Sequence, residues 1–75
     1  MKILKQGRDC FNQKVSVVLV ASDRADVTID ISMSKAYPKI AVINCIDVAQ
    51  ALTVYTDIVE RKVPFNVYNF DVVHY

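Results

Sequence analysis

KVSVVLVASDRADVTIDISM, residues 14–33, contains the two clearest strand patterns in this 75-residue chain. Lys14 to Ser22 holds an uncharged run rich in valine, a composition typical of a strand. From Val27 to Ser34, apolar side chains alternate with polar ones, which is the period of a strand with one buried face. The stretch therefore predicts an antiparallel hairpin with the polar segment Asp23 to Asp26 as its turn.

The pairing register of this hairpin depends on the length of its turn, and two registers fit the sequence. A three-residue loop puts Val17 opposite Ile31 and leaves Val18 and Val20 on the other face of the sheet. A two-residue turn pairs Val18 with Ile31 and leaves Val17 on that other face instead. In both registers, valines remain on the side that a single helix does not cover.

Segments on either side of the hairpin extend the sheet. A short first strand around Ile3 is expected to end in a turn at Gly7, the only glycine in the chain. Ile40 to Asn44 predicts a fourth strand. Phe65 to Tyr75 is rich in Phe, Tyr and Val, and it predicts a last strand with apolar side chains on both faces.

Val48 to Lys62 has the pattern of an amphipathic helix. Asp47 and Gln50 fit an N-terminal capping box, and Pro64 is expected to end the helix. Its apolar stripe consists of Val48, Ala51, Leu52, Tyr55, Ile58, Val59 and Val63. The predicted fold is a single α+β domain over residues 1–75, an antiparallel sheet of four to five strands with a single helix packed on one face.

Composition and charge exclude several classes of protein. Nine Lys and Arg against eight Asp and Glu give a net charge of +1, which provides no global field to attract nucleic acid or an anionic membrane. No apolar run approaches the roughly 18 to 20 residues that a transmembrane helix needs, and no signal-peptide pattern opens the chain. We therefore expect a cytoplasmic protein with both cysteines reduced.

Residues that could support catalysis are few. His74, the only histidine, lies next to the last residue, where chains commonly fray. A single glycine cannot build a phosphate-binding loop, and no metal-ligand spacing is present. Cys45 precedes the predicted helix, so it is either a thiol activated by the helix N-terminus or a buried structural residue, and we favour the latter. The sequence predicts a protein that is not an enzyme and has no cofactor or metal.

The strands carry more apolar residues than one sheet face needs, so both faces are predicted to be apolar. An exposed apolar face usually marks a binding surface. We therefore expect a small protein-binding regulator, an inhibitor or accessory factor, that forms a homodimer through the second sheet face. The residues expected to contact a partner are Val18, Val20, Tyr37, Val67, Val73 and Tyr75.

Nucleic-acid binding is the alternative from a different class. The N-terminal segment is locally basic, and an aromatic ring within it is available to stack on a base. The residues expected to take part are Lys2, Lys5, Arg8, Phe11 and Lys14.

Overall fold

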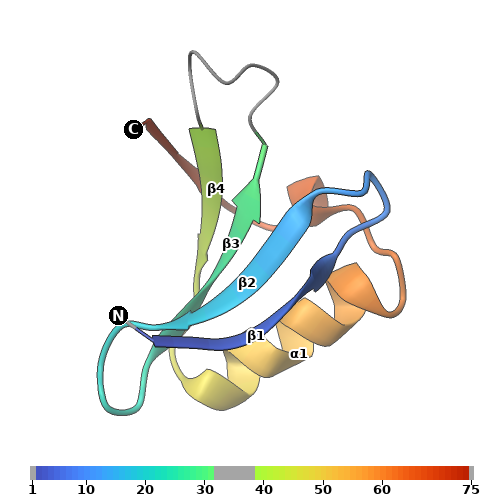
Figure 1. The fold of residues 1–75 in the computed structure, drawn as a ribbon. Helices are drawn as coiled ribbons and strands as arrows, with labels where there is room; N and C mark the ends of the chain where they lie inside the picture. The colour runs from blue at the N-terminus through green and yellow to red at the C-terminus, as the bar shows by residue number, and fades with distance from the viewer. Residues whose placement is uncertain (1, 32–38, 75) are drawn as a thin grey trace.

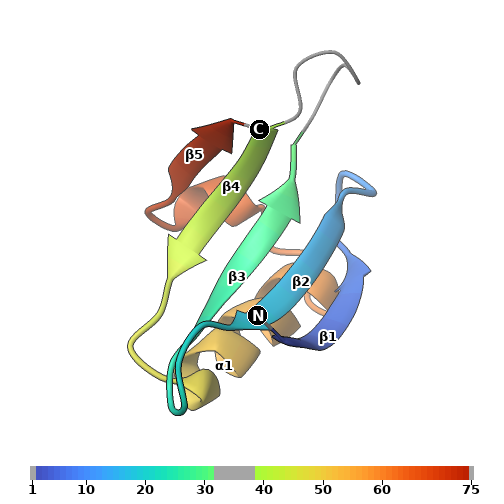
Figure 2. The same ribbon diagram turned by 60° about the vertical axis from the view of Figure 1, so that its left-hand side comes forward.

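The computed structural model describes residues 2–31 and 39–74. These form one antiparallel sheet in the order β1-β2-β3-β4-β5 and one α-helix, which confirms the predicted α+β fold (Figures 1 and 2). The elements are β1 (Lys2–Arg8), β2 (Lys14–Leu19), β3 (Ala25–Asp30), β4 (Lys39–Asn44), α1 (Val48–Val59), the 3-10 helix η1 (Phe65–Val67) and β5 (Asp71–His74). Tyr37, Tyr75 and residues 32–34, which end the predicted third strand, lie outside the described residues.

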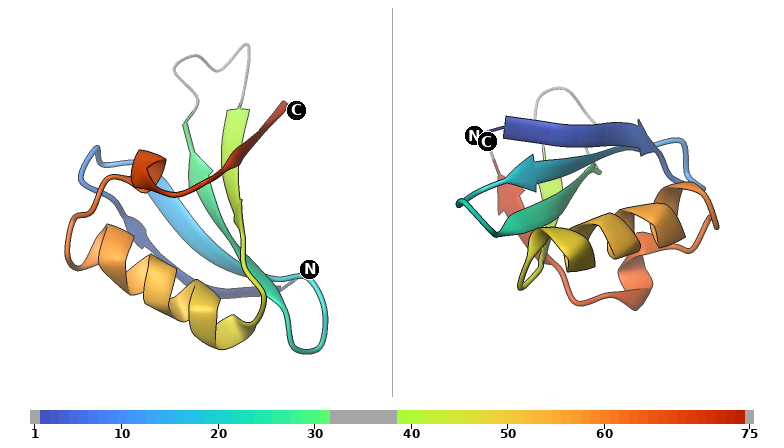
Figure 3. Two further views of the ribbon diagram at one scale, coloured as in Figure 1. Left: turned by 180° about the vertical axis from the view of Figure 1, so that it is seen from behind. Right: turned by 90° about the horizontal axis from the view of Figure 1, so that it is seen from below.

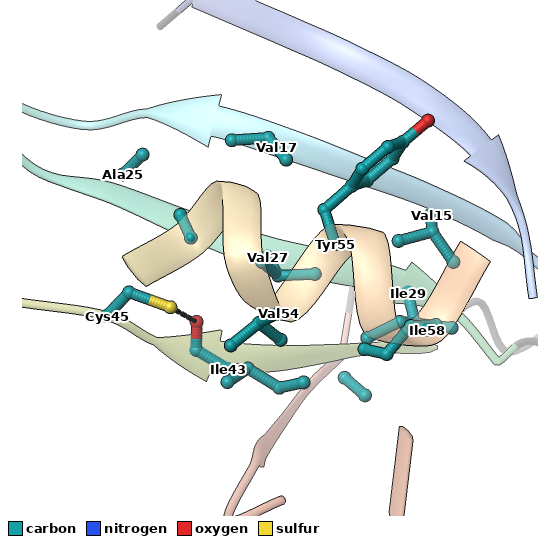
Figure 4. Close-up of a cluster of buried hydrophobic side chains, with 12 residues drawn as sticks. Val15, Val17, Ala25, Val27, Ile29, Ile43, Cys45, Val54, Tyr55 and Ile58 are labelled. Carbon is teal, nitrogen blue, oxygen red and sulfur yellow. Dashed lines mark hydrogen bonds between the residues drawn. The ribbon is translucent and has the colours of Figure 1, made fainter. Parts of the chain in front are cut away.

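The helix α1 packs across β2 and β3 on one side of the sheet, which we call the helix face (Figure 3). Figure 4 shows side chains of neighbouring strands meeting those of α1 in this layer. The core is aliphatic except for one tyrosine and one cysteine, and its members are Val15, Val17, Ala25, Val27, Ile29, Ala41, Ile43, Cys45, Ala51, Val54, Tyr55 and Ile58.

Both predicted registers of the β2–β3 hairpin are wrong. The structure pairs Val17 with Val27 and Val15 with Ile29, because five residues rather than two or three connect the strands. The loop is closed by the Arg24 carbonyl, which accepts from the backbone N–H groups of Val20 at 3.0 Å and Ala21 at 3.2 Å. This register turns Val15 and Val17 toward the helix, where both are fully buried.

The start of α1 is the predicted one. The Gln50 backbone N–H donates to Asp47 Oδ1 at 2.7 Å, and the Gln50 side-chain oxygen accepts from the Ile46 N–H at 2.8 Å. Two polar side chains thus satisfy backbone donors that the first turn leaves without partners.

The end of the helix was predicted too late. The helix ends at Val59 rather than Lys62, since Lys62 has a φ of 58°, in the left-handed region. The Thr56 carbonyl accepts from the N–H of Glu60 at 2.9 Å and from that of Arg61 at 3.2 Å, and the second bond, which spans five residues, widens the last turn before Pro64 is reached. Asp57 and Arg61, four residues apart, form an ion pair at 3.7 Å across the end of the helix.

The last predicted strand is correct only over its second half. Pro64, at φ −60°, leads into the 3-10 turn η1, which is closed by the Tyr68 N–H bonded to the Phe65 carbonyl at 3.1 Å. Phe65 and Tyr68 pack against the core on the helix face. Only Asp71–His74 adds to the sheet, pairing with β4.

Gly7 does not form the predicted turn, because it lies inside β1 under the helix. A Cβ atom at this position would be 2.6 Å from the Tyr55 hydroxyl oxygen and 2.8 Å from Val59 Cγ1. The Tyr55 hydroxyl donates to the Gln6 carbonyl at 2.8 Å. Glycine therefore permits the close approach that joins α1 to the first strand.

We predict that Gly7→Ala lowers the free energy of unfolding by about 1–3 kcal/mol, because the added methyl group overlaps the Tyr55 hydroxyl and Val59. Urea denaturation measures the loss. Tyr55→Phe alone should cost about 1 kcal/mol through the lost hydrogen bond, but much less in the Gly7→Ala background, since it removes an overlapping atom. Additive losses in this double-mutant cycle would contradict the proposed overlap.

Candidate functional site: the open face of the sheet

The side of the sheet opposite α1 is not covered by any described helix or strand, and we call it the open face. The strand registers assign its residues: Ile3, Gln6 and Arg8 on β1, Lys14, Ser16 and Val18 on β2, Asp26, Thr28 and Asp30 on β3, Ile40, Val42 and Asn44 on β4, and Asp71 and Val73 on β5. The prediction that both faces are apolar is wrong, because the middle strand β3 presents only polar side chains here. Apolar residues therefore lie on both flanks of this polar row, Ile3 and Val18 among polar side chains on one flank and Ile40, Val42 and Val73 on the other.

A hollow of about 370 Å³ lies across this face, lined by residues of β1, β2, β3 and β4. Its floor includes Val18 and Ser16, each only 7% exposed although no described element covers them. The Gln6 side-chain amide donates to the Ser16 hydroxyl at 3.4 Å across the floor. Lys14 and Asp30 contribute charged groups of opposite sign to its lining. The hollow can therefore accept an apolar group and offer polar contacts around it.

The four predicted partner-binding residues that the structure describes do not form one surface. Val18 and Val73 share the open face, but they lie on opposite flanks of it. Val20 is exposed in the β2–β3 loop, and Val67 is exposed in η1 on the helix side. Of these four residues, only Val18 and Val73 therefore lie on the open face.

The basic residues predicted to contact nucleic acid are divided between the two faces. Lys2 and Lys5 pair with helix-face positions of β2, and the Lys5 ammonium lies 5.9 Å from the centre of the Tyr55 ring. Arg8 and Lys14 pair with each other on the open side, and the Arg8 guanidinium donates to the Asn12 carbonyl at 3.2 Å. These cations do not form the single basic surface that binding to a phosphate backbone needs.

An aromatic row on the surface was missed by sequence analysis. Phe65 makes edge-to-face contacts with Phe11, at 6.2 Å between ring centroids, and with Phe70, at 5.2 Å. These are all three phenylalanines of the chain, and Phe11 remains 54% exposed. No periodic pattern could predict the row, because its members come from two separate connections, the β1–β2 loop and the segment between α1 and β5.

The β1–β2 loop that presents Phe11 is organised by a buried aspartate. Asp9 Oδ1 accepts from the backbone N–H of Phe11 at 2.9 Å and from that of Gln13 at 2.7 Å. Asn12, at φ 60°, completes the turn. Such side-chain to backbone bonds are typical of aspartate in turns, so we assign Asp9 a structural role.

Tyr68 ties the segment after η1 to the helix. Its hydroxyl donates to Asp57 Oδ2 at 3.0 Å. Burial, followed by this hydrogen bond and the Asp57 charge, raises the pKa of the Tyr68 phenol above its ordinary value of about 10. The bond therefore contributes fully below pH 10 and is lost as the pH rises through the raised pKa.

The two cysteines differ in their surroundings. Cys10 is exposed in the β1–β2 loop, whereas Cys45 is buried and its thiol donates to the Ile43 carbonyl at 3.6 Å. Burial raises the pKa of Cys45, and the nearby Asp26 carboxylate raises it further. This is the opposite of the shift that an activated thiol needs, so the structural interpretation of Cys45 is favoured.

Comparison of the chain with family models, with curated proteins and with solved structures found no match. Residues 2–31 and 39–74 contain no group of three or more His, Cys, Asp or Glu side chains that could hold a metal ion. Within the same residues, no helix is both long enough and apolar enough to cross a membrane.

We predict that the two thiols react at very different rates with a disulfide reagent at pH 8. Cys10 should react at once, while Cys45 should react at least about tenfold more slowly until the protein is unfolded, because it is buried and protonated. Colorimetric titration in native and denaturing buffer measures both. The Cys10→Ser variant isolates Cys45, and rapid native labelling of that variant would contradict a buried structural thiol.

Proposed function

We propose that this protein is a small non-enzymatic regulator, an inhibitor or accessory factor, that binds a protein partner on the open face of its sheet. The observation that carries the proposal is the uncovered face itself, with its hollow of about 370 Å³ between Ile3 on β1 and Ile40 on β4. A sheet that a helix covers on one side does not need apolar residues on its other side. Their presence there is explained if that side binds a partner.

The composition of the open face fits a partner that also folds on its own. Interfaces between such proteins are about as apolar as other protein surfaces, with apolar patches surrounded by polar groups. Here the apolar flanks, such as Val42 and Val73 on one side, can bury aliphatic groups of a partner. The polar row on β3 then supplies hydrogen-bonding groups that give specificity.

A second copy of the chain fits this face less well than a different protein. In a symmetric face-to-face contact, the central strand β3 of one copy would lie near β3 of the other, which brings Asp26 and Asp30 toward the same carboxylates. Like charges that are set against each other across a contact destabilise it. The homodimer that the sequence predicts therefore needs a different contact.

We predict that Thr28→Arg abolishes retention of the partner in a pull-down from a lysate of the source organism. Thr28 lies in the centre of the open face and is part-exposed, so the long cationic side chain fills the hollow without entering the core. Ile46→Arg is the matched control, because Ile46 is exposed outside this face and receives the same charge. Circular dichroism verifies that both variants fold.

A protein retained by the wild type and by Ile46→Arg, but lost with Thr28→Arg, is the expected result. Equal retention by all three forms would contradict the open face as the binding surface.

The alternative function, nucleic-acid binding, is tested by measuring binding to single-stranded and double-stranded DNA and RNA from about 50 to 200 mM salt. We expect no salt-dependent binding, because the basic residues are divided between two faces.

A further inference from the structure

The two edges of the sheet, β1 and β5, differ in a way that has consequences for self-association (Figure 2). β1 carries Lys2, Lys5 and Arg8, and its pairing with β2 is interrupted between Ile3 and Lys5 by a bulge. Edge cations and bulges are two devices by which natural sheets prevent pairing with another chain. β1 is therefore a protected edge.

The β5 edge, Asp71–His74, has neither device. Its sequence contains no Lys or Arg, and its pairing with β4 is regular over all four residues. Its one acidic side chain, Asp71, accepts from the Asn44 side chain of β4 at 3.2 Å. Its short length of four residues is the one feature of this strand that limits the addition of a further strand.

The two valines of β5 are poorly covered. Val72 belongs to the helix face and Val73 to the open face, and they are 44% and 45% exposed. The helix does not cover Val72, because α1 packs on β2 and β3, away from this edge. In the described part of the chain, β5 is thus held by β4 alone, and a second neighbouring strand would bury apolar area on both of its faces.

We propose that β5 pairs in antiparallel fashion with β5 of a second copy, which joins the two sheets into one. A symmetric antiparallel pair requires a two-fold axis perpendicular to the sheet, and residues opposite each other must then lie on the same face. The axis consequently lies midway between one residue and the same residue of the other copy. Centring it on Val72 or on Val73 sets valine against valine, and neither register places Asp71 opposite another Asp71.

A second copy suits this edge better than a flexible peptide does. Only four residues are available for pairing, and ordering a disordered peptide costs about 1–2 kcal/mol per residue. A folded copy brings a strand that is already ordered, so this cost is largely absent. The net charge of +1 also leaves little repulsion between copies.

Protection of the other edge explains why association stops at two copies. If β5 could pair with β1 of another molecule, the contact would repeat and produce an open chain of subunits. The cations and the bulge of β1 oppose that pairing. Pairing of β5 with itself uses the unprotected edge of each copy once and closes the assembly. It leaves the open face uncovered, so this proposal and the proposed function fail independently.

Sedimentation analysis of the full chain at up to about 200 µM tests the dimer. The variants to compare are Val73→Lys on β5 and Ile3→Lys on β1, since these residues are similarly exposed, at 45% and 54%, and both lie on the open face. We expect dimers for the wild type and Ile3→Lys, and dimerisation weakened at least about tenfold in Val73→Lys. A wild type that stays monomeric, or a dimer that survives Val73→Lys, overturns the proposal.

Disulfide cross-linking tests the register without depending on a disruptive substitution. In a Cys10→Ser background, Val72→Cys or Val73→Cys is oxidised with copper phenanthroline, because directly opposed residues lie within the Cα separation of a disulfide. One of the two variants should form a covalent dimer. Val20→Cys, exposed in the β2–β3 loop, is the control. Cross-linking of neither β5 variant, or of Val20→Cys to an equal extent, overturns the β5 contact.

Discussion

A helix of 12 residues is about 18 Å long, and this length limits how much of a five-stranded sheet it can cover. The helix α1 covers the middle of one face, where Val17 and Val27 meet Tyr55 and Ile58. Its close contact with β1 depends on Gly7, whose missing side chain makes room for the Tyr55 hydroxyl. The layer formed in this way is the only extensive core of the described residues, and every other surface of the sheet must be stabilised by other means.

The parts of the sheet that α1 does not cover differ in the side chains that they carry. The polar row on β3 can be hydrated at the centre of the open face. Buried side chains on its β1 side form the floor of the hollow. On the helix side, beyond α1, the three phenylalanines of the aromatic row come from connecting segments and partly cover one another through edge-to-face contacts. Cations protect β1, and β5 alone has no such feature. A protein that binds a partner and pairs with itself would use the two surfaces that its own chain leaves incomplete.

Local patterns predicted the elements whose causes are local. The Asp47 and Gln50 capping box forms between residues three positions apart, and the alternation in β3 follows from the pleat of one strand. The antiparallel sheet with a helix on one face was also predicted correctly, but the strand register and the role of Gly7, which depend on particular contacts between distant residues, were not. The hairpin register depends on hydrogen bonds to the Arg24 carbonyl within a five-residue loop, and the role of Gly7 depends on a helix that begins forty residues later. Neither contact leaves a periodic signal in the sequence.

The sequence by itself determined the fold class, the number of strands to within one and the start of the helix, because secondary structure and capping respond to residues a few positions apart. Only the tertiary structure decided which valines face the helix, since a change of one residue in register moves every side chain of a strand to the opposite face. The observed register alone places Val17 in the core and Val18 at the floor of the hollow. The same long-range pairing divided the N-terminal cations between two faces and left β5 as the unprotected edge.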